Sequence, residues 1–370
     1  MTSGGPASFP EVFFAQAEAQ KERVAMRRKQ YGIWNRITWR EYARMVREAA
    51  AGLLAMEVER GDRVAVLGDN RPEWLVCHIA AMTIGAVTCG VYSTSAADQV
   101  AYVVGHSESG VLFVENEEQV DKVLEILPDL DPVQVIVWDP KGLWGFEHEN
   151  ILLFDDFMER GRAYFAEHPG EIERRMEAIE PDDTAMMIYT SGTTGRPKGA
   201  MITHRNILSI TDSFMEASPV YPTDQMLSYL PLAHIYENLI SVFLAVRAGG
   251  TVNFVESMDT LAANLREVSP TVFASVPRIW EKFASMIEIR MSDAPPVKRL
   301  FYRIGVAAGL KYLRTPKDSR ERVLWAVLYW PLRFLVLYHL KRQLGLERVR
   351  WAICAAAPAS PELFEYYNAL

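Results

Sequence analysis

A stretch of eleven residues, Tyr189 to Gly199, combines the groups that bind a chain of phosphates. Its glycines permit positive φ and close approach of a ligand, and successive exposed N–H groups can form an anion-binding concavity. Its hydroxyls add hydrogen-bond donors, and one lysine adds a positive point charge. The residues expected to contact phosphate are Thr190, Ser191, Gly192, Thr193, Thr194, Gly195 and Lys198. This composition predicts a polyphosphate-binding loop.

The spacing within this stretch excludes two common phosphate-binding loops. A Walker A loop requires Gly-Lys followed by Ser or Thr, whereas Lys198 lies between Pro197 and Gly199. The dinucleotide fingerprint G-x-G-x-x-G is also absent here. The alternative is a solvated surface loop rich in glycine and threonine. The apolar run from Ala185 to Thr190 favours a binding loop, because it predicts a buried strand leading directly into it.

Three further stretches complete a pattern that resembles a known enzyme superfamily. YTSGTTGRPKG resembles the phosphate-binding signature of the adenylate-forming enzymes: acyl- and aryl-CoA synthetases, luciferases and the adenylation domains of peptide synthetases. LPLAHIYE at 230–237 and VPRIWEK at 276–282 are similar to stretches of the long-chain fatty acyl-CoA synthetase branch. AICAAAPAS at 352–360 resembles the adenine-contacting strand and loop, although Ala355 and Ala356 stand where glycine is common.

The resemblance implies a reaction in two steps. A carboxylate joins the α-phosphate of Mg-ATP with release of pyrophosphate, and coenzyme A then converts the acyl-adenylate to a thioester and AMP. By resemblance, His234 and Glu237 are catalytic. His234 and Tyr236 then line the acyl pocket, and Thr190 binds Mg²⁺. The residues that would contact adenine are Ala355, Ala356, Ala357 and Pro358.

The residue types also allow structural roles at these positions. A histidine after a strand is often a hydrogen-bonded structural residue, and only the surrounding PLAHIYE pattern favours a functional His234. Glu237 could equally cap or brace the helix that follows it.

The chain ends before several parts that the family carries. Ser360 and Pro361 predict the start of a helix, and the sequence stops at Leu370. Family members continue with a Tyr-Gly-x-Thr-Glu stretch whose Glu completes the Mg²⁺ site, and with a mobile C-terminal domain that carries a catalytic Lys. We therefore expect residues 1–370 to be an incomplete N-terminal domain without the C-terminal lobe, inactive or nearly so in adenylation by itself.

Alternating strand and helix signals surround these motifs. The stretch from Thr38 to Glu41 is a capping box, Val64 to Gly68 is a predicted strand, and Asn70 is the predicted N-cap of a helix ending at Met82. Further strands are predicted at 87–91, 111–114, 133–138, 185–190, 226–230, 251–254, 271–275 and 349–354. Such alternation predicts an α/β fold with two related subdomains, whose helix-covered sheets are mainly parallel. Pro and Gly residues indicate a soft subdomain boundary at 139–183.

Composition and charge limit the classes of function. Hydrophobic residues make up 49% and charged residues 23% of the chain, which is typical of a soluble globular protein. The net charge of -8 disfavours a general nucleic-acid partner, because phosphate backbones are bound by a surplus of Lys and Arg. Cys77, Cys89 and Cys354 resemble buried free thiols of a reducing compartment, and the N-terminus lacks a signal-peptide pattern. We expect a cytoplasmic protein.

One apolar segment, residues 323–338, complicates that expectation. It contains a single charged residue, Arg333, and is interrupted by Pro331. A membrane-spanning helix needs ~20 predominantly apolar residues. Its aromatic side chains and flanking Lys and Arg would suit an interfacial helix at the inner face of a membrane, and a helix buried against the domain is the alternative.

Two rival functions stay open at the level of sequence. An amino-acid-activating domain that serves a carrier protein usually holds the substrate ammonium with an Asp, whereas PLAHIYENL offers only Glu237. A non-catalytic remnant would bind nucleotide or acyl groups without turnover. The resemblance favours a long-chain fatty acid–CoA ligase, whose partners are ATP with Mg²⁺, a fatty acid and coenzyme A.

Overall fold

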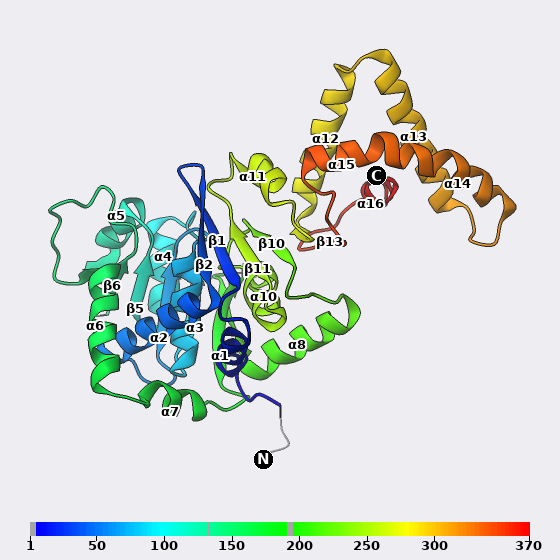
Figure 1. The fold of residues 1–370 in the computed structure, drawn as a ribbon. Helices are drawn as coiled ribbons and strands as arrows, with labels where there is room; N and C mark the ends of the chain where they lie inside the picture. The colour runs from blue at the N-terminus through cyan, green and yellow to red at the C-terminus, as the bar shows by residue number, and fades with distance from the viewer. Residues whose placement is uncertain (1–4, 132, 191–194) are drawn as a thin grey trace. The chain divides into compact units, whose positions relative to one another are not determined.

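The computed structural model describes residues 5–131, 133–190 and 195–370 (Figure 1). The chain forms two units. The first contains Met1–Thr223 and Ser228–Val255, and the second contains Asp224–Leu227 and Glu256–Leu370. The phosphate-binding motif and the LPLAHIYE stretch therefore belong to the first unit, and the stretch expected to contact adenine belongs to the second.

A seven-stranded sheet forms the centre of the first unit. Its strand order is β7-β6-β5-β3-β4-β8-β9, and all neighbours are parallel except β8 and β9. Since β3 lies between β4 and β5, the chain continues to opposite sides of β3, and such a switch point leaves strand ends open to a ligand. The strands are β3 (Arg63–Leu67), β4 (Val87–Val91), β5 (Ser109–Val114), β6 (Gln134–Val137), β7 (Ile151–Leu153), β8 (Thr184–Thr190) and β9 (Lys198–Thr203).

Helices cover both faces of this sheet (Figure 1). On one face, Leu112 of β5 packs in a buried cluster with Val100 of α4 and Val120 of α5. The next residue of β5, Phe113, points to the other face and packs edge-on against Phe157 of α6. Burial on both faces explains why these strands are almost continuously apolar. The helices of the first unit are α1 (Phe9–Gln20), α2 (Trp39–Ala55), α3 (Pro72–Thr83), α4 (Ala97–Ser107), α5 (Glu117–Ile126), η1 (Leu127–Asp129), α6 (Phe154–Glu167), α7 (Glu171–Glu177), α8 (His204–Ala217), α9 (Ile235–Glu237), η2 (Asn238–Leu244) and α10 (Ala245–Ala248).

A smaller sheet in the first unit contains a hairpin that the sequence analysis misses. β1 (Val24–Gln30) pairs antiparallel with β2 (Ile33–Thr38) and parallel with β11 (Thr251–Phe254). Tyr31 and Gly32 form the turn, both with positive φ. Charged residues interrupt the apolar alternation of these strands, which hides the period of two. A further strand, β10 (Gln225–Ser228), crosses the division between the units.

The second unit contains a parallel strand pair and a helical hairpin. β12 (Val272–Ser275) pairs with β13 (Trp351–Cys354). The helices are α11 (Leu261–Val268), α12 (Pro277–Ser292), α13 (Pro296–Arg314), α14 (Arg320–Leu332), the π-helical turn η3 (Arg333–Leu337), α15 (Tyr338–Leu344) and α16 (Pro361–Ala369). α14, η3 and α15 continue as one helix through Pro331, and the helix changes to the π-helical turn η3 just after the proline, at Arg333. Many side chains of this helix are exposed, so the alternative of a helix buried against the domain is wrong.

The structure confirms most predicted elements and corrects two details. The predicted strands at 87–91 and 251–254 coincide with β4 and β11, and the capping box of Thr38 and Glu41 is present. Helix-covered, mainly parallel sheets are confirmed. The segment 139–183 contains β7, α6 and α7 of the first unit. Asn70 is not an N-cap, since Arg71 occupies that position and its side chain makes no capping bond. Cys354 is only partly buried.

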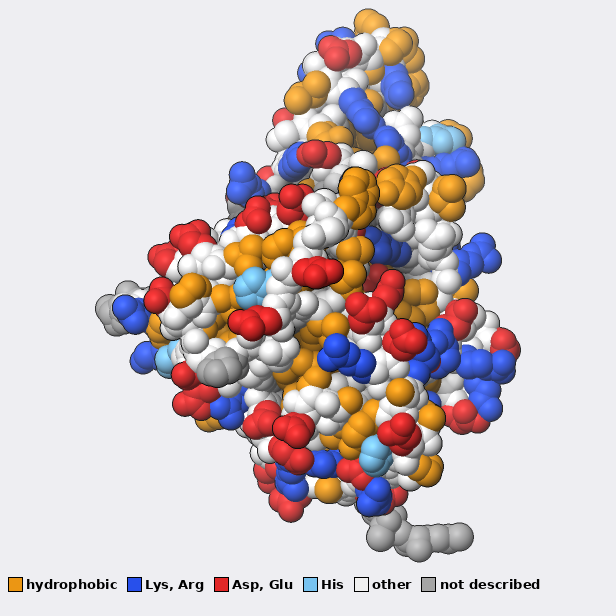
Figure 2. Space-filling model, turned by 90° about the vertical axis from the view of Figure 1, so that its left-hand side faces the viewer, with side chains coloured by type: hydrophobic (Ala, Val, Ile, Leu, Met, Phe, Trp, Pro, Cys, Tyr) orange, Lys and Arg blue, Asp and Glu red, His pale blue; other side chains and the backbone are white. Residues whose placement is uncertain are grey.

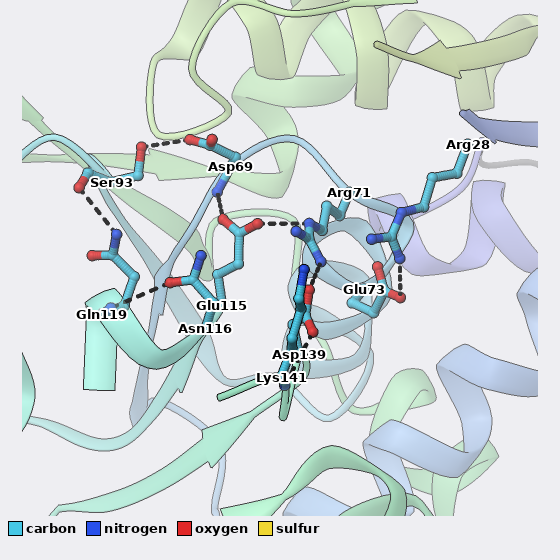
Figure 3. Close-up of polar contacts among 10 residues, drawn as sticks. All are labelled: Arg28, Asp69, Arg71, Glu73, Ser93, Glu115, Asn116, Gln119, Asp139 and Lys141. Atoms are coloured by element: carbon cyan, nitrogen blue, oxygen red, sulfur yellow. Dashed lines mark hydrogen bonds and ion pairs between the residues drawn. The ribbon is translucent and has the colours of Figure 1, made fainter. Parts of the chain in front are cut away.

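A network of polar contacts joins the carboxyl ends of four neighbouring strands (Figure 3). Glu115, directly after β5, accepts a hydrogen bond from the Asp69 amide at 2.6 Å and pairs with the Arg71 guanidinium at 2.6 Å. Arg71 also pairs with Asp139 after β6 at 2.8 Å, and Ser93 after β4 donates to Asp69 at 2.6 Å. Burial raises the pKa of the Glu115 carboxyl, against the opposing effect of Arg71. The network therefore fixes the turn that follows β3.

We expect Arg71→Met to lower the free energy of unfolding by about 3 kcal/mol, because it leaves the buried Glu115 without its charge partner. The double variant Arg71→Met/Glu115→Gln should recover most of this loss. Arg205→Met, which breaks the exposed pair with Asp182, is the control and should cost less than about 1 kcal/mol. Equilibrium urea unfolding measures all three, and equal losses in the two single variants would contradict the assignment.

Candidate functional site

The described ends of the predicted phosphate-binding stretch lie on two paired strands. β8 and β9 are antiparallel, and Thr190 pairs directly with Lys198, so this pair closes the loop. Both residues are exposed, and directly opposed Cβ atoms in such pairs lie about 5 Å apart. Gly195 has a φ of +112°, a conformation that favours glycine. The other predicted phosphate contacts, Ser191, Gly192, Thr193 and Thr194, lie outside the described residues.

Helix α4 holds both ends of this stretch. Tyr102 donates a hydrogen bond from its hydroxyl to the Pro197 carbonyl at 2.8 Å, and the Arg196 guanidinium lies 5.3 Å from the Tyr102 ring centre. One turn later, His106 Nδ1 lies 2.9 Å from the Tyr189 hydroxyl. No local sequence signal identifies Tyr102 or His106, because their role depends on which helix packs beside β8.

The stretch that carries His234 lies on the carboxyl ends of β3 and β4. Gly90 of β4 has no side chain, and a Cβ there would lie 2.7 Å from the Ala233 Cα. After β3, the Asn70 side chain donates to the Ser228 hydroxyl at 2.8 Å and to the Leu230 carbonyl at 2.6 Å. The sequence analysis misses these contacts, because they join residues about 160 positions apart.

The pairing of β4 with β8 brings the two motifs to one edge of the sheet. These strands are adjacent and parallel, with Thr88 opposite Met186 and Cys89 opposite Met187. Their carboxyl ends therefore lie side by side, roughly 4.8 Å apart. One end receives the stretch that carries His234, and the other leads into the phosphate-binding stretch.

His234 is oriented by the start of helix α9. Its Nδ1 accepts a hydrogen bond from the Tyr236 amide at 3.1 Å, so in the neutral ring the proton resides on Nε2. Burial lowers the pKa of His234, which keeps the ring neutral near pH 7. The side chain can therefore donate a hydrogen bond from Nε2 to a carboxylate or phosphate oxygen. The Tyr236 side chain is half-buried beside it in the chain.

Glu237 lies inside the first unit and not on its surface. Only 2% of the residue is exposed, and Oε1 accepts hydrogen bonds from Ser228 at 2.7 Å and Ser241 at 2.6 Å. Burial raises the pKa of its carboxyl to about 7, while these hydroxyls and the amides of Tyr229 and Leu230 oppose the shift. These contacts allow Glu237 to brace the stretch that carries His234, and its catalytic role stays a prediction.

The stretch expected to contact adenine follows β13 in the second unit. Ala355 is half-buried and donates from its amide to the Ser275 carbonyl at 3.2 Å, while Ala356, Ala357 and Pro358 are exposed. Ala356 has a φ of +69°, a left-handed conformation that costs an alanine more than a glycine. This backbone requirement agrees with glycine being common at that position in the family.

The described side chains could supply only part of the ligand set of a metal ion at this site. Within residues 5–131, 133–190 and 195–370, no group of three or more His, Cys, Asp or Glu side chains could hold a metal. Mg²⁺ commonly takes one or two oxygens from protein and the rest from substrate phosphates and water. The exposed hydroxyl of Thr190 fits that partial role at the end of β8.

Two relatives illustrate how widely the sequence similarity extends. Human long-chain-fatty-acid–CoA ligase ACSBG2 is 30% identical over 370 residues, which cover 99% of this chain and 54% of the relative. Human long-chain-fatty-acid–CoA ligase ACSBG1 is 27% identical over 376 residues, with 99% of this chain and 50% of the relative covered. The chain thus spans about half the length of the curated relatives it matches.

Solved structures show the same fold. The inhibitor-bound N-terminal domain of FACL13 from Mycobacterium tuberculosis has a TM-score of 0.68 at 20% identity, covering 98% of this chain and 73% of that one. The didomain of carboxylic acid reductase from Segniliparus rugosus, in complex with AMP, has a TM-score of 0.67 at 19% identity, covering 99% and 52%. The family model described as AMP-binding enzyme matches residues 13–370. With that match over nearly its whole length, this chain belongs to the AMP-binding enzyme family.

Proposed function

We propose that this chain supplies the ATP- and carboxylate-binding part of a long-chain fatty acid–CoA ligase. The observation that carries the proposal is the placement of two motifs on the carboxyl ends of adjacent parallel strands, β4 and β8. One motif has the composition of a phosphate-binding loop, and the other presents a neutral histidine donor. The sequence similarity to long-chain-fatty-acid–CoA ligases supports the choice of substrate class.

The proposed reaction joins two anions, which repel each other, and residues at this edge of the sheet offset the repulsion. An oxygen of the fatty acid carboxylate attacks the α-phosphorus of ATP, and the bond to the pyrophosphate oxygen breaks. Lys198 and the glycine-rich backbone attract the phosphates, while His234 Nε2–H donates to an oxygen of the carboxylate or the α-phosphate. Holding the two reactants in line can supply ~7–11 kcal/mol of the barrier reduction.

The second step transfers the acyl group to coenzyme A. The thiolate sulfur attacks the acyl carbonyl carbon, and the bond to the AMP oxygen breaks. When bound with ATP, Mg²⁺ would neutralise phosphate charge, with the Thr190 hydroxyl as a protein ligand. Both the acceptor thiol and the metal are proposals that rest on the family.

The burial of Glu237 argues against the amino-acid-activating rival. A substrate ammonium requires an accessible carboxylate, and Glu237 is the one acidic side chain of the PLAHIYENL stretch. Its Oε1 already accepts hydrogen bonds from Ser228 and Ser241, and 2% of the residue is exposed. The fatty acid, which has no ammonium group, needs no such partner.

Fatty-acid-dependent exchange between ATP and labelled pyrophosphate tests the proposed function in the complete polypeptide. We expect exchange with long-chain fatty acids and none with amino acids. We expect Lys198→Ala to lower the exchange rate about 10²–10³-fold, because it removes a preorganised positive charge beside the phosphates. Lys317→Ala, in the exposed turn between α13 and α14, is the matched control. A Lys198→Ala rate equal to that of the control would refute the role of Lys198, and exchange with amino acids alone would refute the substrate class.

Asn70 should act as a positioning residue for the stretch that carries His234. Without its donors to Ser228 and Leu230, this stretch loses a tie to β3, and we expect Asn70→Ala to lower kcat about 10- to 100-fold. The KM for ATP should stay unchanged, because Asn70 follows β3, which β4 separates from β8 and the phosphate-binding stretch. Asn116→Ala, which removes the N-cap of α5, is the control. If the two variants lose stability equally and keep equal kcat, the positioning role fails.

The raised pKa of Glu237 predicts a pH dependence of stability. The pKa of Glu237 is about 7 in the folded chain and ~4.3 in an unfolded one. Between about pH 4.3 and pH 7, the folded state therefore binds one proton at Glu237 that the unfolded state has released. The stabilisation from this proton is complete below about pH 4 and is lost as pH rises through 7, by up to roughly 4 kcal/mol. Glu237→Gln, which cannot titrate, should lack this component.

Urea unfolding of wild type and Glu237→Gln at pH 5 and pH 8 measures this component. We expect the free-energy difference between wild type and variant to fall by about 2–3 kcal/mol from the lower to the higher pH. Buried His78 and His204, with pKa values of about 3 and about 4, titrate equally in both proteins and cancel in the difference. A pH-independent difference would show that Glu237 does not bind the proton.

A further inference from the structure

The helical hairpin of the second unit, residues 296–344, has a charge opposite to that of the whole chain. It contains eleven Lys and Arg residues against two acidic ones, Asp318 and Glu321, which gives +9. The complete chain has a net charge of -8, so the remaining residues carry -17. This segment therefore concentrates positive charge in an otherwise acidic protein, which is the charge needed to approach an anionic surface.

The same hairpin exposes a continuous apolar stripe. Along the helix of α14, η3 and α15, exposed large apolar side chains recur at spacings of three and four residues, at Val323, Val327, Trp330, Phe334 and Tyr338. Val327 and Phe334 each leave 72% of their surface exposed. A stripe with this spacing lies on one side of a helix. Exposed apolar surface of this extent marks an interaction site.

The opposite side of the helix is already occupied within the second unit. Tyr329 is buried, stacks on Tyr312 of α13 and donates its hydroxyl to the Ala369 carbonyl of α16 at 3.0 Å. Leu332 and Leu337 pack toward Gly305 of α13. The exposed stripe is thus the side that these contacts leave free. Figure 2 shows hydrophobic side chains lying among Lys and Arg side chains at the α12–α13 end, at the top of the view.

Positive side chains stand at both ends of the stripe. Exposed Arg320 begins the helix, and exposed Arg342 lies near its end. Between them, exposed Trp330 and Tyr338 are of the residue types that favour the boundary between lipid and water. This combination of apolar stripe, aromatic residues and flanking cations fits a helix lying in the plane of an anionic bilayer.

We infer that the hairpin docks on the surface of an anionic lipid bilayer through this stripe, a property beyond the proposed enzymatic function and independent of it. The helix Arg320–Leu344 is long enough to cross a membrane, at about 37 Å, and has a mean hydropathy of 1.5 with 17% of its apolar window buried. A crossing helix, however, would carry Arg333 to the middle of the bilayer. It would also break the Tyr329–Ala369 contact. Docking in the plane of the bilayer keeps Arg333 out of the bilayer centre and preserves the Tyr329–Ala369 hydrogen bond.

Vesicle flotation of the 370-residue chain tests the inference. We expect binding to vesicles of equal parts phosphatidylcholine and phosphatidylserine, weaker binding at high salt, and little binding to phosphatidylcholine alone. Each Lys or Arg near an anionic surface strengthens binding about fivefold, so Arg320→Gln/Arg342→Gln should bind about 20- to 30-fold more weakly. Arg36→Gln/Arg160→Gln, exposed cations of the first unit, is the matched control and should bind as wild type.

The apolar part of the inference has its own variant. Leu324→Ser/Val327→Ser/Phe334→Ser removes three side chains that are each 72% exposed, so the fold should persist while binding is lost. Tyr31→Ser/Ile33→Ser, two exposed apolar residues in the turn and at the start of β2, is the matched control. Thermal unfolding midpoints check that all variants are folded.

Several results would overturn the inference. Equal binding to both vesicle types would do so, and so would control variants that bind vesicles as weakly as the test variants. Resistance of the bound chain to extraction by alkaline carbonate would indicate a crossing helix. A fourth is dimerisation in the absence of lipid that the triple apolar variant abolishes, because the stripe would then be an interface between two copies. Release by carbonate together with selective loss in the Arg320/Arg342 and triple apolar variants would support it.

Discussion

The parallel pairing of β4 with β8 is the constraint on which the candidate site depends. Parallel neighbours end at the same edge of a sheet, so the exit of β8 toward the phosphate-binding stretch and the end of β4 beneath Ala233 lie together. Gly90 makes the second contact feasible, because any side chain there would displace the Ala233 backbone. Asn70 adds a third tie from the neighbouring strand β3. The sheet thus places two distant sequence motifs within reach of one reactant pair.

Buried, hydrogen-bonded carboxyl groups brace this edge of the sheet. Glu115 and Glu237 are both almost inaccessible to water, and each is stabilised by donors from separate elements: Arg71 and the Asp69 amide for Glu115, and two serine hydroxyls for Glu237. A buried carboxylate without such partners would be strongly destabilising. Movement of the stretch that carries His234 would break the hydrogen bonds that Glu237 accepts from Ser228 and Ser241. Such bracing suits catalysis by positioning.

The second unit shows a different physical design. Its hairpin packs inward through Tyr329 and Leu337, while the outward side presents apolar residues bordered by arginine. In the acidic context of the chain, a local charge of +9 would direct this unit toward anionic surfaces. If the proposed function holds, such docking would bring the protein to the phase in which long-chain fatty acids partition.

The sequence by itself determined most of the element types and the order of helices and strands. Strands such as β4 and β11 were predictable because burial on both faces requires short apolar runs. The phosphate-binding role of the stretch after Thr190 stays a prediction. The charged β1–β2 hairpin was not predicted, because its apolar and polar residues do not alternate with a clear period of two. Only the tertiary structure decided that Glu237 is buried, that Asn70 and Tyr102 support the two motifs, and that the apolar helix is exposed. These facts depend on contacts between residues far apart in the chain, and local pattern contains no information about which distant elements will pack together.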